Sequence, residues 1–404
     1  MNDRRQFWTL RYTLINISYF AAFCTVHAYA AVYLLDRGFS NTQIGILLAV
    51  ANIASAVLQP VVASVIDRGG LFTNRNVMMI CAAAIAAGSG LLLLLHDNRA
   101  AIFVIYALIY MIQFTYMPVM TALNFEYRRK GADIFYGLAR GLGSAGFAVT
   151  SAIMGKVVEA EGVRVLLFFN IVIMIIQIVV VWFFRIPEQA SDAEGATGEA
   201  EQIDGAGNAR GRTIAEFVRA YPAFMVMLAA TVFLFFTHNM LNDYLIQIIR
   251  PLGGSESNLG IATFIAALLE LPTMAFISAA SKKISMRFML VISGFSFTVK
   301  AVIMMLAVNI PMVYISQAMQ LLAYAVFIPA SAYYVSTNIS SHDQVKGQAF
   351  VTSCFTLAGV FSSLICGVIL DHFGEKAMLI CGSIISVIGT VLIIISMKMS
   401  PKER

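Results

Sequence analysis

Long apolar blocks alternate with short polar loops along almost the whole chain. A helix needs about 20 apolar residues to cross the hydrocarbon core of a bilayer, which is roughly 30 Å thick. Twelve blocks reach this length, at residues 12–35, 42–66, 77–95, 100–125, 136–158, 163–184, 222–248, 258–280, 287–308, 311–339, 348–370 and 377–397. Within lipid every backbone donor must find its acceptor in the same segment, so such blocks cross only as helices. The pattern therefore predicts an all-α membrane protein with twelve transmembrane helices.

One long polar stretch interrupts this pattern between the sixth and seventh blocks. The segment EQASDAEGATGEAEQIDGAGNARGR, residues 188–212, is rich in Gly, Ala and acidic residues and has no aromatic residue. Such a composition buries too little apolar surface to order itself. We expect residues 186–220 to form a flexible cytoplasmic linker between two six-helix bundles, residues 1–185 and 221–404.

The two halves also resemble each other weakly. Residues 27–49 align without a gap on residues 242–264, at an offset of 215. The identical pairs include Tyr29 with Tyr244, Ser40 with Ser255, and Gly45 with Gly260. The alignment places the first helix on the seventh and the second on the eighth. Parallel six-helix repeats around a central cavity are the plan of one large class of transporters.

Composition and charge indicate the environment and the orientation of the chain. Hydrophobic residues make up 59% of the sequence and charged residues 12%, which is too little charge to cover a soluble domain. With the N-terminus inside, 19 Lys and Arg residues fall on the cytoplasmic side, 6 on the outer side and 2 within helices, which accounts for all 27. Because Lys and Arg concentrate in cytoplasmic loops, we expect both termini in the cytoplasm and a multi-pass protein of the plasma membrane.

Other classes of protein find no support in the sequence. The net charge of +5 follows from the loop asymmetry and needs no nucleic acid to explain it. The five cysteines lie in apolar blocks without metal-ligand spacing, and the chain has neither a P-loop nor a recognisable Ser/His/Asp arrangement. The first apolar block is a full span, so no cleavable signal peptide is expected. We expect no enzyme activity, cofactor, metal or nucleic acid, and a monomer.

Two local motifs resemble the major facilitator superfamily. The loop ASVIDRGGLFTNRN, residues 63–76, is similar to the superfamily motif between the second and third helices. The resemblance implies a cytoplasmic gate built from Asp67, Arg68, Gly70 and Arg75, in which the acid lies near a helix N-terminus and the arginines pair across the halves. The alternative is a plain positively charged loop, but an acid within it favours the gate.

The segment YGLARGLGSAGF, residues 136–147, resembles the signature that opens the fifth helix in the lactose permease-like branch, the oligosaccharide:proton symporters and their relatives. This resemblance implies that Arg140 lies in the substrate cavity. The sequence departs from the branch elsewhere: Phe147 replaces the tryptophan that stacks on the sugar, and Gln320 replaces a proton-handling histidine. A lactose-like sugar site is therefore not expected.

Ionisable side chains within the apolar blocks are candidates for function. Each costs about 2.5–3.5 kcal/mol on insertion scales and therefore usually faces the bundle interior or a wet cavity. Three stand out, namely Glu270 in the stretch GIATFIAALLELPTMAFI, Lys300 and Arg140. Further residues expected around the same cavity are His27, His238, Asn242, Asp243, Gln113, Phe147, Gln317, Gln320 and Tyr324.

Glu270 is the candidate for proton coupling, with Lys300 as its partner. Burial makes a carboxyl group hold its proton more tightly, whereas a nearby ammonium group favours the ionised acid. A glutamate that alternates between a protonated state and a paired state would couple proton movement to transport. The alternative is a static Glu–Lys pair that braces two helices.

These residues together indicate transport of a small organic solute. If Glu270 and Lys300 neutralise each other, Arg140 keeps no obvious buried acid except Asp243, and a free arginine favours an anion. We expect a secondary active transporter that works by alternating access, as a proton-coupled symporter for an organic anion or a sugar-like solute. One alternative is a drug or metabolite:proton antiporter, although the fifth block lacks the proline typical of those exporters. A membrane sensor that has lost transport is the second alternative.

Overall fold

The computed structural model describes residues 3–185, 213–280 and 284–400, and every regular element within these ranges is a helix. The N-terminal half contains α1 (Asp3–His27), α2 (Ala30–Asp36), α3 (Asn41–Asp67), α4 (Asn74–Leu94), α5 (Arg99–Arg129), α6 (Tyr136–Glu161) and α7 (Arg164–Phe183). The C-terminal half contains α8 (Ile214–Ala220), α9 (Pro222–Asp243), α10 (Leu245–Ile249), α11 (Glu256–Ala280), α12 (Met286–Met305), α13 (Ile310–Ala318), α14 (Tyr324–Asn338) and α15 (Gln344–Met399), with short 3-10 turns η2 (Arg250–Leu252), η3 (Met319–Leu321) and η4 (Ser341–Asp343).

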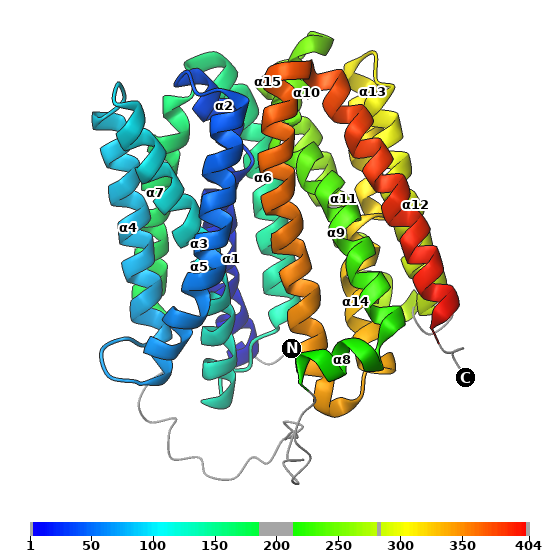
Figure 1. Cartoon of the computed structure of the whole chain (residues 1–404). Coiled ribbons are helices and arrows are strands. Elements are labelled where there is room, and N and C mark those ends of the chain that lie inside the picture. The colour runs from blue at the N-terminus through cyan, green and yellow to red at the C-terminus, as the bar shows by residue number, and fades with distance from the viewer. Residues whose placement is uncertain (1–2, 186–212, 281–283, 401–404) are drawn as a thin grey trace.

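Most of these helices are long and apolar enough to cross a membrane. Nine of the described helices meet this condition, or ten if α1 and α2, which are bent by 43°, count as one span. The 56 residues of α15 would make a straight helix about 84 Å long, but Gly374 has non-helical φ 78° and ψ 178°. At this glycine the orange and red parts of α15 meet and then run separately through the bundle (Figure 1). A positive φ suits glycine because it has no Cβ.

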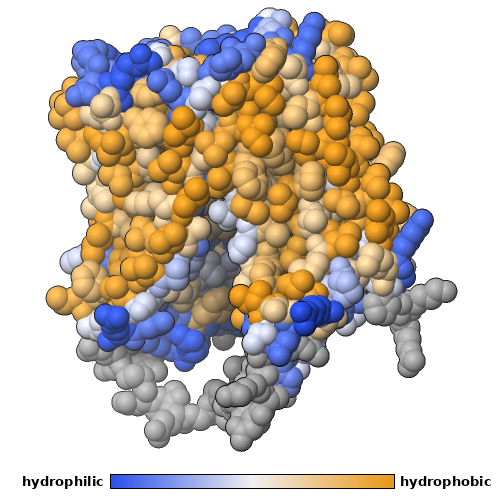
Figure 2. Space-filling view, in the orientation of Figure 1, coloured by the Kyte–Doolittle hydropathy of each residue, from blue (hydrophilic) through white to orange (hydrophobic). Residues whose placement is uncertain are grey.

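The helices stand side by side, with their apolar faces outward. Exposed large hydrophobic residues such as Val57, Leu94 and Phe183 form this outer surface, and a broad hydrophobic band covers the molecule between two more polar ends (Figure 2). The N-terminus, the C-terminus and α8 lie at one of these ends, which we call the α8 end (Figure 1). We call the opposite end the far end; it carries the start of α3 and the break at Gly374.

Two pairs of helices join the halves, α3 with α15 and α6 with α11. In each pair a glycine allows the backbones to touch: a Cβ on Gly45 would collide with the carbonyl oxygen of Ser363, and a Cβ on Gly260 with that of Ser151. Small residues permit such close approach between membrane helices. All these contacts lie near the far-end termini of their helices, and we call the two pairs together the far seam.

A carboxylate closes one side of the far seam. Asp371 on α15 accepts hydrogen bonds from the backbone N–H groups of Asn41 at 3.1 Å and Thr42 at 2.7 Å, and from Asn41 Nδ2 at 2.9 Å. These N–H groups belong to the first turn of α3, where helical donors lack partners and negative charge is favoured. Gln247 adds a further bond from its Nε2 to Asn41 Oδ1 at 3.0 Å.

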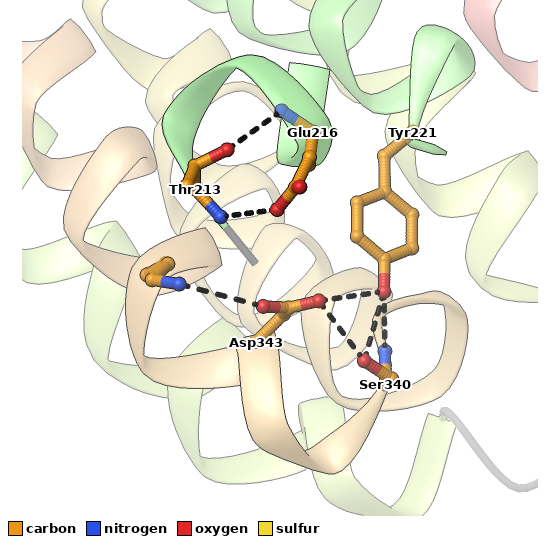
Figure 3. A network of polar contacts seen from close by, with 6 residues as sticks. Thr213, Glu216, Tyr221, Ser340 and Asp343 are labelled. Carbon is orange, nitrogen blue, oxygen red and sulfur yellow. Dashed lines mark hydrogen bonds and ion pairs between the residues drawn. The ribbon is translucent and has the colours of Figure 1, made fainter. Parts of the chain in front are cut away.

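The expected linker, residues 186–220, is ordered at its end. Residues 186–212 lie outside the described residues, whereas α8 begins with a capping box in which Thr213 N donates to Glu216 Oε2 at 2.8 Å and Glu216 N to Thr213 Oγ1 at 3.4 Å (Figure 3). The Tyr221 hydroxyl then lies 2.9 Å from Ser340 Oγ and 3.2 Å from Asp343 Oδ2. These bonds attach α8 to the loop that follows α14, so its residues belong with the C-terminal bundle.

Candidate functional site

A cavity of about 470 Å³ lies between the two halves. It is lined from α1, α3, α5 and α6 on one side and from α9, α11, α15 and the α13–α14 region on the other. The far seam closes it at the far end, and Figure 2 shows the surface hollowed between the halves toward the α8 end. The cavity walls contain these residues singled out from the sequence: His27, Arg140, Phe147, Asn242, Asp243, Glu270, Gln317, Gln320 and Tyr324, together with His238.

Glu270 and Lys300 are joined through an amide and not directly. Lys300 Nζ donates to Gln320 Oε1 at 2.7 Å, and Gln320 Nε2 donates to Glu270 Oε1 at 2.8 Å. Lys300 is fully buried behind the cavity wall, whereas Glu270 lines the cavity. No direct ion pair joins Glu270 and Lys300 in this structure, because Gln320 lies between the two charges, and the paired state stays a prediction.

The backbone around Gln320 explains how the amide reaches both partners. α13 ends at Ala318, the turn η3 carries Gln320, and Ala323 has the non-helical angles φ −79° and ψ −90° before α14 begins. Irregular backbone at membrane depth is tolerated where it lines a cavity or is buried in protein. The break turns Gln320 toward α11 and α12, which carry the two charged residues.

Arg140 lies on the opposite side of the cavity, in the second turn of α6. Its Nη1 donates to Ser144 Oγ at 2.8 Å, and its guanidinium carbon lies 4.2 Å from the centre of the Phe20 ring. Among the described residues no carboxylate oxygen lies within 4.0 Å of this guanidinium. A guanidinium presents five N–H donors, so most of them remain available to a ligand.

Two histidines and several aromatic rings form the remaining walls. The His27 ring is stacked on Phe23 with 3.7 Å between centroids and lies 3.8 Å from Tyr110, and neither of its nitrogens has a hydrogen-bond partner among the described residues. His238 Nε2 lies 3.1 Å from Asn242 Nδ2, and its ring is stacked on Tyr324. These rings offer flat apolar faces beside polar atoms.

The sequence did not predict three of the polar residues that line the cavity, and one residue that it did predict, Gln113, does not line it. Asn52, Asn239 and Tyr110 line it; a neutral amide or phenol within an apolar block was the available signal, but it does not show which way the side chain points. Gln113 is instead buried between α5 and α1, where its Nε2 donates to the Ala22 carbonyl at 3.3 Å. Gln113 does not line the cavity because it lies on the face of α5 that packs against α1.

The loop expected to form the cytoplasmic gate makes no ion pair between the halves among the residues that the structure describes. Asp67 ends α3, Arg68 follows it, and Gly70 adopts φ 82°. Arg75 lies 6.0 Å from the Trp182 ring centre in the same half. In the part of the chain that the structure describes, the Asp67 side chain forms no ion pair across the halves. The halves are apart at the α8 end, so the gate stays a prediction for a state closed at that end.

Comparisons with known proteins agree with this architecture. The model of the MFS_1 like family matches residues 8–381. The sequence is 22% identical to Uncharacterized transporter YwbF of Bacillus subtilis (strain 168) over 90% of this chain and 86% of that protein. It is also 22% identical to Maltose permease of Geobacillus stearothermophilus over 98% and 95% of the two chains.

Solved structures show the same fold at low sequence identity. The nucleoside transporter NupG, as its D323A mutant, superposes with a TM-score of 0.78 at 12% identity over 97% of this chain and 99% of that one. A bacterial homologue of the human lysosomal transporter Spinster, in an inward-facing and unoccupied conformation, gives a TM-score of 0.70 at 14% identity over 98% of both chains.

The chain belongs to the MFS_1 like family, within the major facilitator superfamily. It is a secondary transporter of the plasma membrane and not an enzyme, in keeping with its transporter relatives and its apolar spans.

Proposed function

We propose that the protein takes up a small organic anion or a sugar-like solute together with protons. The observation that carries this proposal is the hydrogen-bonded series Glu270–Gln320–Lys300. Glu270 and Gln320 line a cavity that also holds Arg140, and Lys300 lies behind its wall. Glu270 is the site that gains and loses the coupled proton, and Lys300 acts on it through Gln320. Arg140 and the other cavity residues bind the solute.

Arg140 supports an anion as the solute. Its guanidinium bonds to Ser144 and leaves donors that a carboxylate or phosphate could take bidentately. A sugar-like solute is supported by the similarity to a maltose permease and to a nucleoside transporter. The aromatic walls around His27 and Tyr324 suit a ring in either class.

The uptake proposal is tested with purified protein in liposomes under an imposed pH gradient. A mixed pool of sugars, nucleosides and organic acids is offered, and the internal contents are identified by mass spectrometry. We expect at least one solute to accumulate above its external concentration only when the outside is acidic. Accumulation driven by an alkaline outside would instead indicate the antiporter, and no movement of any solute would contradict transport of these classes.

Alternating access in this proposal uses twelve spans in two groups of six, residues 1–185 and 221–404. The connection, residues 186–220, ends in α8, which packs on the second group. This count takes α1 with α2, α9 with α10 and α13 with α14 as single spans, adds α11, and divides α15 at Gly374. Both termini and the α8 end then face the cytoplasm, and Asp67, Arg68, Gly70 and Arg75 close that end when the cavity opens outward. The protein works as a monomer.

We expect residue 200 and residue 97 to lie on opposite sides of the membrane. In a background without the five native cysteines, Ala200→Cys should react with an impermeant maleimide only after the cells are opened. Asp97→Cys, in the loop between α4 and α5, should react in intact cells. Labelling of residue 200 from outside would overturn the orientation that the 19 against 6 distribution of Lys and Arg supports.

A further inference from the structure

A second acid of the cavity lies beside the far seam. Asp243 is the last residue of α9, at the point where the helix is interrupted before α10, and its side chain lines the cavity. Its Oδ2 accepts a hydrogen bond from Ser363 Oγ at 3.2 Å. Among the described residues no Lys, Arg or His nitrogen lies within 4.0 Å of this carboxylate. Beyond lining the solute cavity, Asp243 has no part in the proposed coupling through Glu270.

Ser363 connects this acid to the backbone contact between the halves. Its side chain is fully buried, and its one hydroxyl proton is shared between Asp243 Oδ2 at 3.2 Å and the Gly359 carbonyl oxygen of its own helix at 2.8 Å. Its carbonyl oxygen accepts a bond from the Tyr244 hydroxyl at 2.5 Å. The same carbonyl faces Gly45 of α3 so closely that a Cβ there would collide with it. One residue therefore touches the cavity with its side chain and the far seam with its backbone.

The second helix pair of the far seam, α6 with α11, has an equivalent contact without an acidic residue. The Tyr29 hydroxyl donates to the Ser151 carbonyl at 2.6 Å, and Gly260 packs against that carbonyl as Gly45 packs against Ser363. Here the serine hydroxyl donates across the seam, from Ser151 Oγ to the Gly260 carbonyl at 3.2 Å. At the repeat offset of 215, Ala28 is the residue equivalent to Asp243.

We propose that Asp243 controls the opening of the far seam between α3 and α15. The ionised carboxylate holds the Ser363 hydroxyl, and with it the backbone turn of α15 that packs on Gly45. When a proton from the aqueous cavity binds the carboxylate, or a solute donor replaces Ser363 on it, the Ser363 hydroxyl bonds to the Gly359 carbonyl alone. The link from Asp243 to α15 is then lost, and α15 separates more readily from α3. The inference rests on the proposed function in assuming that this seam opens during transport.

The surroundings of Asp243 provide no competing cation. Asn52 and Tyr110, from α3 and α5, line the same part of the cavity, as do Asn239 and Asn242 from its own helix. The titratable groups that act on or beside it are the phenols of Tyr110 and Tyr244 and the thiol of Cys366. All three are neutral across the physiological pH range when unperturbed, so among these four groups Asp243 is the one whose charge changes. His27, His238 and Glu270 also line the cavity, and the Asp243→Asn variant separates their titration from that of Asp243.

The test measures the far seam itself, without any solute. Spin labels are placed at Asp97→Cys and Lys376→Cys, two exposed far-end positions in opposite halves, in full-length protein in nanodiscs without the native cysteines. We expect Asp243→Asn and Ser363→Ala each to raise the ratio of open to closed seam by about tenfold, since a charge-assisted hydrogen bond is lost. In the protein that keeps Asp243, the open fraction of the far seam should increase as the pH falls, and Asp243→Asn should remove this pH dependence.

Ser362→Ala is the matched control, because it removes the neighbouring buried hydroxyl, which does not face Asp243. It should leave the distance distribution unchanged. The proposal is overturned if Asp243→Asn keeps the distribution and pH dependence of the parent, or if Ser362→Ala shifts them as much as Ser363→Ala does. A seam that responds as expected in a protein that moves no solute would instead contradict the transport proposal and leave this one standing.

Discussion

Glu270→Gln is expected to abolish proton-driven accumulation of solute while leaving solute exchange intact. The amide nearly preserves the shape of the side chain and can still accept the Gln320 Nε2 bond, which now measures 2.8 Å. It cannot release a proton, so the free energy of the proton gradient is no longer transmitted. Exchange needs no net proton movement and should continue. Both rates are measured on the same proteoliposomes, with and without a pH gradient.

Two further variants separate coupling from structural support. Glu256→Gln, at the far-end start of the same helix, loses only a surface pair with Arg250 at 2.8 Å and should accumulate solute normally. Lys300→Ala removes the cation that favours ionised Glu270, so uptake should persist to higher pH before it declines. If Glu270→Gln still concentrates solute, Glu270 only braces α11 against Gln320. Loss of exchange as well would make it a solute-binding or folding residue.

The sequence predicted the long elements because twenty apolar residues leave the backbone few choices in lipid. The blocks 348–370 and 377–397 anticipated the division of α15 at Gly374, since EKA follows a glycine there. The helical end of the linker was missed although Thr213 and Glu216 have the spacing of a capping box. The low-complexity composition of residues 188–212 led us to extend the expected linker over this short helix.

Candidate site residues divided according to their charge. Arg140 and Glu270 line the cavity and Lys300 is buried behind its wall, because lipid excludes all three charges. A neutral amide can satisfy itself between helices, as Gln113 does, or line the cavity, as Gln317 does, and hydropathy does not distinguish the two. The bridge through Gln320 depends on the local turn η3, which no periodic pattern signals.

The largest conformational effect is expected from adding one methyl group at the far seam. Gly45→Ala places a Cβ against the Ser363 carbonyl, and Gly260→Ala places one against the Ser151 carbonyl. Backbone atoms cannot turn aside as a side chain can, so the helices must separate. Overpacking of this kind costs typically about 1–3 kcal/mol, and each 1.4 kcal/mol is a tenfold change in an equilibrium constant. The closed far seam should therefore become about ten- to a hundredfold less populated.

Gly90→Ala provides the comparison, because a Cβ at this glycine in α4 meets no atom within 4 Å. It gains the same helix propensity and should keep the parent distribution of distances between labels at residues 97 and 376. The added Cβ raises the free energy of the closed seam and not that of the open one. Gly45→Ala should therefore open the seam while lowering the thermal unfolding temperature less than a substitution in the hydrophobic core would. An unchanged distance distribution in both Gly45→Ala and Gly260→Ala would show that these helices do not separate at the glycines, and that another contact limits the opening of the far end.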